Sequence, residues 1–491
     1  MAEKMDVHDI KETPDVESPR ANMSASDLEI DHQAEKKLVR KLDTWLAPLM
    51  VLFFLVAYLD RSNIGNAAIA GMTEDLHLDS GKLNVAVTVF YVTYIAFEIP
   101  ASLVLKKARP SRLIPFFILA WSATVVGSAF VQNYAGLLAT RLLLGAFESG
   151  LFPCLTLYLS TFYKPSEQAR RVSYLFVAAA LSGAFGGLLA YGLTSLHGAK
   201  GLAGWRWLFL VEGVISIVVG ILALFLLPDN FEVAWWLKED DKALMRVRAE
   251  QVKIYAGESE VFDKHEVKLA FKDPKVWLSS ICQFCANTCS FGFGTFLPLI
   301  IKGFGYSSLK SQALTAPIYF WASFIYLVVS YFSDRLNRRA VFMVPAALIT
   351  VVGYAMMLGL NMKSTGPLYL ATFFTATGIY IVVGLNVTWV SNSNAGYFKR
   401  ATAIGLQQTI GNSSGIMAGQ IYRFVAPDGR YLVGGAVSMS TMFVGGCGYA
   451  LMWYLLRRIN KQRDAMSIEE RERLIQQGAK GDRHPDFRYT L

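Results

Sequence analysis

The stretch Arg141-Leu-Leu-Leu-Gly-Ala-Phe-Glu148-Ser-Gly-Leu-Phe-Pro153 places an arginine and a glutamate inside a segment that is otherwise apolar. Glu148 follows Arg141 by almost two helical turns, so both side chains are expected on one face of a helix. A charged side chain near the centre of a bilayer costs at least ~2.5–3.5 kcal/mol, so both must face protein or water. The stretch therefore predicts a membrane-spanning helix that lines a polar cavity.

A second charged pair interrupts the first apolar segment, in Tyr58-Leu-Asp60-Arg61-Ser-Asn63-Ile-Gly65. Counting ~1.5 Å per residue along each predicted helix puts Asp60, Arg61 and Arg141 at one level, with Glu148 nearer the membrane centre. We therefore expect the two helices to present these four charges to one vestibule.

The composition is that of an integral membrane protein. Of the 491 residues, 53% are hydrophobic and 17% are charged, against roughly 25% charged in soluble domains, and the mean hydropathy is +0.36. Apolar windows of about 20 residues, the length that spans a bilayer, occur twelve times. They are residues 46–67, 83–104, 113–132, 135–161, 172–196, 206–227, 276–300, 313–333, 340–361, 367–391, 401–422 and 433–456.

The expected fold is thus an all-α membrane protein with twelve transmembrane helices in two six-helix halves. A polar segment rich in Lys, Asp and Glu separates the halves. The predicted divisions are a disordered cytoplasmic tail (1–41), the first half (42–227), a cytoplasmic linker (228–275), the second half (276–457) and a cytoplasmic tail (458–491).

Basic residues gather in alternate short loops, which predicts the orientation because cytoplasmic loops carry the excess of Lys and Arg. An even number of spans then puts both tails in the cytoplasm. The formal charge of +9 needs no nucleic acid partner, because loops beside anionic lipid account for it. The loop residues are Lys106, Lys107, Arg109, Arg112, Lys164, Arg170, Arg171, Arg335, Arg338, Arg339, Lys399 and Arg400.

The chain resembles the major facilitator superfamily in two features. It has two six-helix halves, and the motif Asp334-Arg-Leu-Asn-Arg-Arg339 follows the eighth window. Further motifs resemble the fungal allantoate permease branch of its anion:cation symporters. They are Asp60-Arg-Ser-Asn-Ile-Gly65, Phe97-Glu-Ile-Pro100, Arg141 to Pro153, Gly204-Trp-Arg-Trp-Leu-Phe209 and Gly481-Asp-Arg-His-Pro-Asp-Phe-Arg-Tyr489. The resemblance implies uptake of organic anions such as allantoate, nicotinate, pantothenate or biotin, usually with protons. The chain departs from the superfamily at Lys106 to Arg112, which lacks the acid and glycines of the first-half loop motif.

The four buried charges suggest a proton-coupling device, because making or breaking a carboxylate–arginine pair changes how tightly the carboxylate holds a proton. Our hypothesis is that Asp60 pairs with Arg141 in the empty protein, that Glu148 is the main titrating acid, and that Arg61 receives a substrate carboxylate. The resemblance implies the same roles. The alternative is a permanent ion-pair network that holds the two helices together.

Two other acids lie in predicted spans and are interpreted as structural. Glu98, just before Pro100, is expected near the cytoplasmic end of its helix within reach of loop arginines, and Glu212 is expected to pack or cap.

Neutral polar and aromatic residues are expected to complete the pocket. In the second half the preferred substrate contacts are Asn386, Trp389 and Asn412, although hydrogen bonding between helices is an equal alternative for each. In the first half they are Tyr58 and Tyr94, since tyrosines can position a carboxylate without adding charge.

The loop motif of the second half is predicted to act as a gate. Its residues are Asp334, Arg335, Arg338 and Arg339. Plain positive-inside charge would explain the arginines but not Asp334, so we expect the motif to pin neighbouring helix ends on the cytoplasmic face.

The sequence thus predicts a monomeric secondary transporter, importing a small organic anion with protons across the plasma membrane. An exporter of a secondary metabolite is an alternative, disfavoured because Ser182-Gly-Ala-Phe-Gly-Gly187 lacks the proline of drug antiporters. A nutrient sensor that does not transport is another. No enzyme centre, cofactor or metal site is expected, and Cys282, Cys285 and Cys289 are interpreted as helix-packing residues.

Overall fold

The computed structural model describes residues 31–105, 109–256, 264–477 and 481–491. Most of the predicted N-terminal tail, residues 1–30, and the loop residues Lys106 and Lys107 lie outside the described residues. Helices are the only regular secondary structure in the described part of the chain.

Each apolar window coincides with one helix, except that the fourth is divided between two. The first half contains α1 (His32–Ala67), α3 (Ser80–Leu105), α4 (Pro110–Ser128), α5 (Tyr134–Glu148), α6 (Leu151–Ser160), α7 (Pro165–Thr194) and α8 (Gly204–Leu226). The second half contains α11 (Pro274–Gly303), α12 (Ser308–Leu336), α13 (Ala340–Gly359), α14 (Thr365–Asn392), α15 (Tyr397–Ile421) and α16 (Leu432–Asp464). Shorter elements are η2 (Ala68–Met72), α2 (Thr73–Asp75), α9 (Glu239–Ala256), α10 (Lys264–Lys272), η3 (Ala199–Gly201), α17 (Ile468–Gln476) and η4 (Gly481–Arg483).

The helix count confirms the predicted fold. In the described residues ten helical segments are long and apolar enough to cross a membrane. α3 and α15, with 26 and 25 residues, complete the twelve. Polar caps mark where several begin: the side chains of Asn133, Asp273 and Ser307 accept hydrogen bonds from the first turns of α5, α11 and α12.

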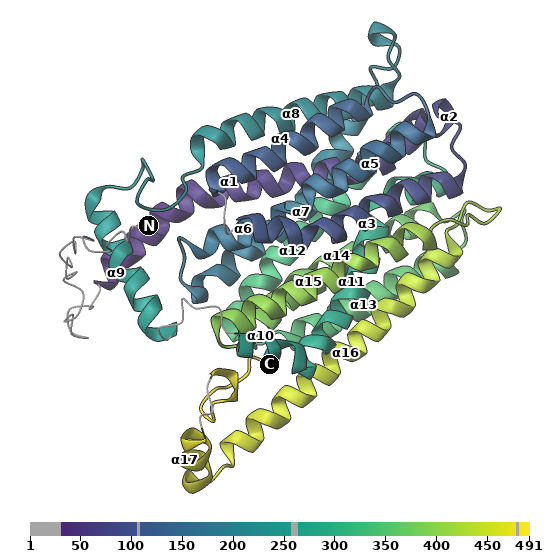
Figure 1. Ribbon diagram of the computed structural model, residues 1–491. Coiled ribbons are helices and arrows are strands. Elements are labelled where there is room, and N and C mark those ends of the chain that lie inside the picture. Colours follow the sequence, from purple (N-terminus) through teal and green to yellow (C-terminus); the bar gives the residue numbers. More distant parts are fainter. Residues whose placement is uncertain (1–30, 106–108, 257–263, 478–480) are drawn as a thin grey trace, which may run out of the picture.

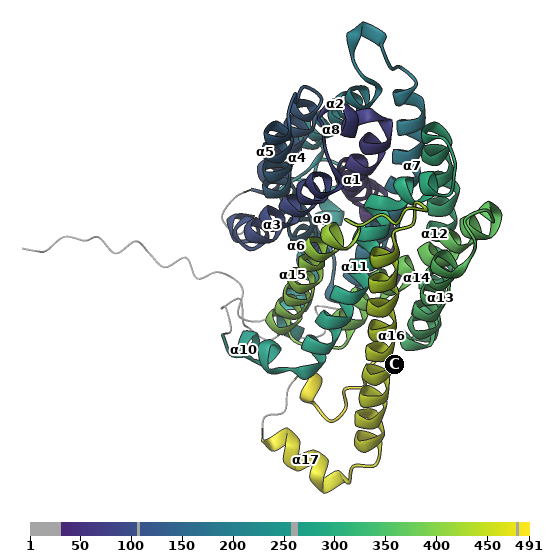
Figure 2. The same ribbon diagram turned by 90° about the vertical axis from the view of Figure 1, so that its right-hand side faces the viewer.

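The two halves form two bundles that lie side by side (Figures 1 and 2). In Figure 1 the first, coloured purple to teal, lies largely above the second, coloured teal-green to yellow. We call the end of the bundle where α1 begins the inner end, after the predicted orientation, and the opposite end the outer end. α9, α10 and α17 all lie at the inner end (Figure 1).

The start of the first half differs from the prediction. α1 begins at His32, ahead of the boundary predicted at residue 42, because Asp31 caps it by accepting a hydrogen bond from the Gln33 amide at 2.8 Å. The linker also packs on this end. In α9, Arg248 forms ion pairs with Glu35 at 2.8 Å and with Glu167 at 2.5 Å.

Contacts between the halves close the outer end. On α15, Gln420 donates to Thr88 of α3 at 2.6 Å, and on α7 Thr194 donates to Gln312 of α12 at 3.0 Å. Glycines allow this approach, since a Cβ on Gly187 would lie 2.7 Å from the carbonyl oxygen of Gln312. The two halves are therefore in direct contact at the outer end.

Candidate functional site

An ion pair between Arg61 of α1 and Glu148 of α5 lies inside the first bundle. Nη2 and Nε of Arg61 lie 2.5 and 2.9 Å from Oε1 of Glu148. The two side chains are 10% and 1% exposed, so the pair is almost completely removed from solvent. Oε2 of Glu148 has no hydrogen-bond partner among the described residues, which leaves half of the carboxylate available.

Four aromatic rings surround the guanidinium of Arg61. Its central carbon lies 4.6 Å from the ring centroid of Tyr58 and 4.8 Å from that of Tyr94. Phe90 and Phe291 lie at 5.3 and 6.0 Å. Phe291 belongs to α11, so Arg61 faces the second half as well as the first. The rings form an apolar box around one cation, which strengthens its electrostatic interactions.

The local sequence explains why Glu148 is available to the bundle interior. α5 ends at this residue, and α6 begins at Leu151 after a two-residue turn. Pro153 has no N–H and cannot bond to the carbonyl of Ser149, which favours a break there. α5 also approaches α3 closely, because Gly145 lies against the backbone of Phe90.

Arg141 is buried and has no ion-pair partner among the described residues. The residue is 3% exposed, and its Nε and Nη2 make no hydrogen bond to the described residues. Its guanidinium carbon lies 5.7 Å from the ring of Phe209 on α8. The carboxyls that act on it electrostatically are those of Glu148 and Asp60. Arg141 is therefore a buried cation that no described side chain neutralises directly.

The predicted pair of Asp60 with Arg141 is absent from this structure. Oδ2 of Asp60 instead accepts hydrogen bonds from Ser216 of α8 at 2.8 Å and from the indole of Trp121 on α4 at 3.2 Å. Consecutive residues point about 100° apart around a helix. Arg61 therefore faces α5 and α11 while Asp60 faces α4 and α8.

The second-half candidates are spread over three places. Nδ2 of Asn412 donates to Glu98 of α3 at 3.2 Å, so this candidate faces the first half. Asn386 lies in a buried network inside the second half, where it accepts from Ser279 at 2.9 Å and donates to Gln283 at 2.8 Å. Trp389 lies at the inner end, where its indole donates to the carbonyl of Thr490 at 2.9 Å. The structure therefore does not bring Trp389 to the ion pair.

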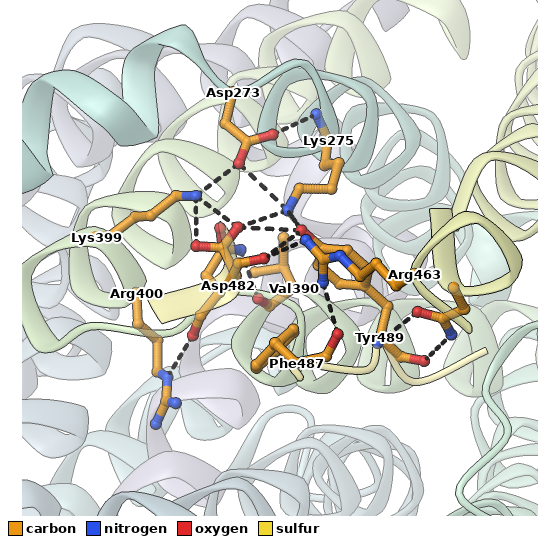
Figure 3. Close-up of polar contacts among 11 residues, drawn as sticks. Asp273, Lys275, Val390, Lys399, Arg400, Arg463, Asp482, Phe487 and Tyr489 are labelled. Carbon is orange, nitrogen blue, oxygen red and sulfur yellow. Dashed lines mark hydrogen bonds and ion pairs between the residues drawn. The ribbon is translucent and has the colours of Figure 1, made fainter. Parts of the chain in front are cut away.

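The C-terminal tail is docked on the inner end of the second half (Figure 3). Its Asp482 forms ion pairs with Lys399 of α15 at 2.7 Å and Lys275 of α11 at 2.8 Å. From α16, Arg463 donates to the carbonyls of Asp482 and Phe487 at 2.7 and 2.6 Å. Burial raises the pKa of Asp482, but the two lysines outweigh burial and hold that pKa below its usual range.

The predicted gating loop is partly tied to this tail. Oδ1 of Asp334 lies 2.5 Å from Nη2 of Arg339, and the backbone amide of Arg339 donates to the carbonyl of Leu491. Arg335 and Arg338 are exposed. Asp334 thus neutralises the one buried arginine of its own loop, and the gating role stays a prediction.

Several residues near the four charges were missed or placed differently by the sequence analysis. Glu98 does not reach loop arginines, because Asn412 of the other half binds it. Glu212 is completely buried and accepts from Asn63. Phe90 and Phe291 were not singled out. The spacing of Phe90 and Tyr94 by four residues, one face of a helix, is a signal that finds Phe90.

Comparisons with known proteins agree with this architecture. A sequence model described as Major Facilitator Superfamily matches residues 50–419. An uncharacterized transporter of Schizosaccharomyces pombe is 46% identical over 94% of this chain and 92% of its own length. A high-affinity nicotinic acid transporter of Saccharomyces cerevisiae is 35% identical over 93% of this chain and 85% of its own.

A solved structure is similar in fold. It is a bacterial homolog of the human lysosomal transporter Spinster, in an inward-facing and occupied conformation. The TM-score is 0.63 with 14% sequence identity, over 84% of this chain and 97% of that one.

Proposed function

The chain belongs to the major facilitator superfamily and is a multi-pass membrane transporter, and from this premise we propose that it imports a small organic anion together with protons. The proposed setting is the plasma membrane, with both termini cytoplasmic and the protein acting as a monomer. The proposed substrate class is a monocarboxylate with a planar ring, for which nicotinate is the first probe because a relative carries that name.

One observation carries this proposal: the guanidinium of Arg61, which is paired with Glu148, lies among four aromatic rings. An arginine guanidinium binds a carboxylate through two parallel hydrogen bonds. In this structure Glu148 occupies that guanidinium with one oxygen. A substrate carboxylate therefore has to displace Glu148 from Arg61 in order to bind there.

Displacement is easiest when Glu148 carries a proton. A neutral carboxyl no longer attracts Arg61 strongly, whereas an ionised one left without its arginine would be a buried, unpaired charge. Substrate binding to Arg61 and proton binding to Glu148 thus favour each other. The two ligands then move together, which is symport.

The rings give a reason for preferring a planar substrate. Offset or edge-on stacking suits aromatic partners at the spacing of these rings, and Tyr58 and Tyr94 add hydroxyl groups that can bond to a carboxylate. Asn412 and Asn386 stay predicted second-half contacts, the first being nearer the interface between the halves.

Arg141 supplies the second charge of the proposed mechanism. It is buried, and no described side chain forms an ion pair with it, so it makes the vestibule attractive to an anion while Arg61 is neutralised by Glu148. A helix movement that brings Arg141 to Asp60 or Glu148 would favour the ionised acid and release its proton.

The testing experiment is uptake of labelled nicotinate, allantoate, pantothenate and biotin into cells that express the protein. Each is measured at acid and neutral external pH, with and without a protonophore. Concentrative uptake of one of them that rises at acid pH and collapses with the protonophore is expected. Proton-driven loss from preloaded cells, without uptake, would contradict import.

A further inference from the structure

Two polar contacts join α1 to α8 behind the site. In one, Ser216 of α8 donates to Asp60 of α1 at 2.8 Å. In the other, Asn63 of α1 donates through its amide nitrogen to Glu212 of α8. Asn63 follows Asp60 by three residues and Ser216 follows Glu212 by four, so each pair shares a helix face. We call Asp60, Asn63, Glu212 and Ser216 the α1–α8 cluster.

The cluster holds two carboxyls and no cation in direct contact. Asp60, Asn63 and Glu212 are each 0% exposed. Neither acid forms an ion pair within the described residues, although Arg61 beside Asp60 in sequence is paired with Glu148. Three buried oxygens, Oδ1 of Asp60, Oδ1 of Asn63 and Oε1 of Glu212, have no hydrogen-bond partner there. The cluster thus contains more acceptors than donors.

The groups that face the two acids differ. Asp60 receives hydrogen bonds from Ser216 and Trp121, and Arg141 and Glu148 of α5 act on it electrostatically. Glu212 meets Asn63 of α1, and the only charged group acting on it among the described residues is Asp60. Within the described residues Glu212 therefore has no ion-pair partner to stabilise an ionised form, and the ionisable group that acts on it is another acid.

A buried carboxylate without a cation is strongly disfavoured, and a proton removes both its charge and the excess of acceptors. We propose that Glu212 is a second proton-binding site of the transporter, separate from the Arg61–Glu148 pair. Glu212 holds a proton in this state, and Asp60 is the ionisable neighbour that acts on it electrostatically. The coupling of this site to transport rests on the function proposed above.

A purely structural role predicts something different. If Glu212 only accepts the hydrogen bond of Asn63, a glutamine carbonyl does the same, and Glu212→Gln changes no property that depends on protons. Sodium is the other ion that a cluster of several unpartnered oxygens can bind, and it prefers ionised carboxylates.

The first test is the infrared spectrum of the purified full-length protein, in which a protonated carboxyl has its own carbonyl stretching band. At neutral pH the wild type is expected to show this band, and E212Q is expected to lose the part that belongs to one carboxyl. In N63A the same component is expected to shift, because the carbonyl loses its donor, without losing intensity. The control is E74Q, which removes an exposed glutamate of α2 and should leave the band unchanged.

A band that neither E212Q nor N63A alters overturns the proposal. So does a Glu212 component that appears when sodium chloride is replaced by choline chloride, because sodium then occupies the site as the carboxylate. If E212Q fails to fold, the N63A shift alone decides the protonation of Glu212.

The second test measures transport of labelled nicotinate in cells. The ratio of uptake at acid pH to uptake at neutral pH is expected to fall towards one in E212Q and to stay at the wild-type value in E74Q. An E212Q ratio equal to that of the wild type overturns the coupling. If the wild type does not take up nicotinate, the function proposed for that substrate fails, while the infrared bands still decide whether Glu212 binds a proton.

Discussion

Nη2 of Arg61 lies 2.5 Å from Oε1 of Glu148, so α1 and α5, which carry the four charges of the candidate site, are joined by one ion pair. The neighbouring Arg141, on the same helix as Glu148, has no such partner in the part of the chain that the structure describes.

Replacing Glu148 by glutamine should separate anion binding from protons. The amide resembles the protonated acid and cannot neutralise Arg61, so nicotinate should bind without a proton. We expect the ratio of uptake at acid and neutral pH to fall towards one, while exchange of labelled for unlabelled nicotinate continues. A wild-type ratio in E148Q would favour the permanent ion-pair network instead.

Replacing Arg61 by lysine should weaken substrate binding although the charge is kept. Lysine cannot form two parallel hydrogen bonds to a carboxylate, and it loses the flat contact with the rings of Tyr58 and Tyr94. Loss of these contacts should cost about 1–2 kcal/mol of substrate binding free energy, which corresponds to a roughly 10-fold increase in KM. The measurement is the concentration dependence of initial uptake. An unchanged KM in R61K would place the substrate carboxylate elsewhere.

Replacing Arg141 by methionine should abolish uptake without lowering thermal stability. No described side chain pairs with this arginine, so its removal relieves a buried charge and breaks no ion pair. The matched control is R171M, since Arg171 binds Asp43 through two contacts of 2.9 and 2.7 Å. R171M should lower stability by about 1–3 kcal/mol. Thermal unfolding in detergent measures the stability of both variants. A large loss of stability in R141M would indicate that Arg141 has a structural role.

Replacing Asp482 by asparagine should release the C-terminal tail. The carboxylate neutralises Lys275 and Lys399 together, so the variant leaves two cations without their shared partner. We expect a lower apparent Tm and faster proteolysis after the end of α16. The pKa of Asp482 is lower in the folded protein than in the unfolded one.

The contribution of the Asp482 carboxylate to the free energy of unfolding is therefore fully present above about pH 4. It is lost only as the pH falls through the lowered pKa of Asp482 in the folded protein. Between pH 5 and pH 7 the tail should stay docked. For folded D482N, the ratio of uptake at acid pH to uptake at neutral pH should thus equal that of the wild type. A changed ratio would implicate the tail in proton coupling.

Replacing Trp389 by phenylalanine tests whether this residue contacts substrate. The ring is kept but the N–H that binds the carbonyl of Thr490 is lost. We expect faster proteolysis of the tail and an unchanged KM for nicotinate. A raised KM with a docked tail would restore the substrate contact predicted from the sequence.

The helices and the burial of Arg141 and Glu148 could be predicted because both follow from local pattern. Apolar runs of spanning length give the helices, and the seven-residue spacing in Arg141 to Glu148 gives two buried charges on one face, 3% and 1% exposed. Which charges pair could not be predicted. Asp60 and Arg61 are adjacent, and the direction in which each points depends on how α1 is rotated in the bundle.

The docking of the tail could not be predicted either. Its contacts join Asp482 to lysines about 83 and 207 residues earlier in the chain, and no periodicity in the sequence records such a contact. For the same reason Trp389, which lies in an apolar window, was expected in the pocket and not under the tail.

The closed outer end has a pharmacological consequence. In the orientation proposed above the outer end faces the medium, and there Gln420 binds Thr88 and Thr194 binds Gln312 across the two halves. A competitive inhibitor added outside the cell has to wait for these two contacts to separate, so its apparent potency depends on how often they do. Variants that loosen the contact between Gln420 and Thr88 should therefore become more sensitive to such a compound even though they leave its binding residues untouched.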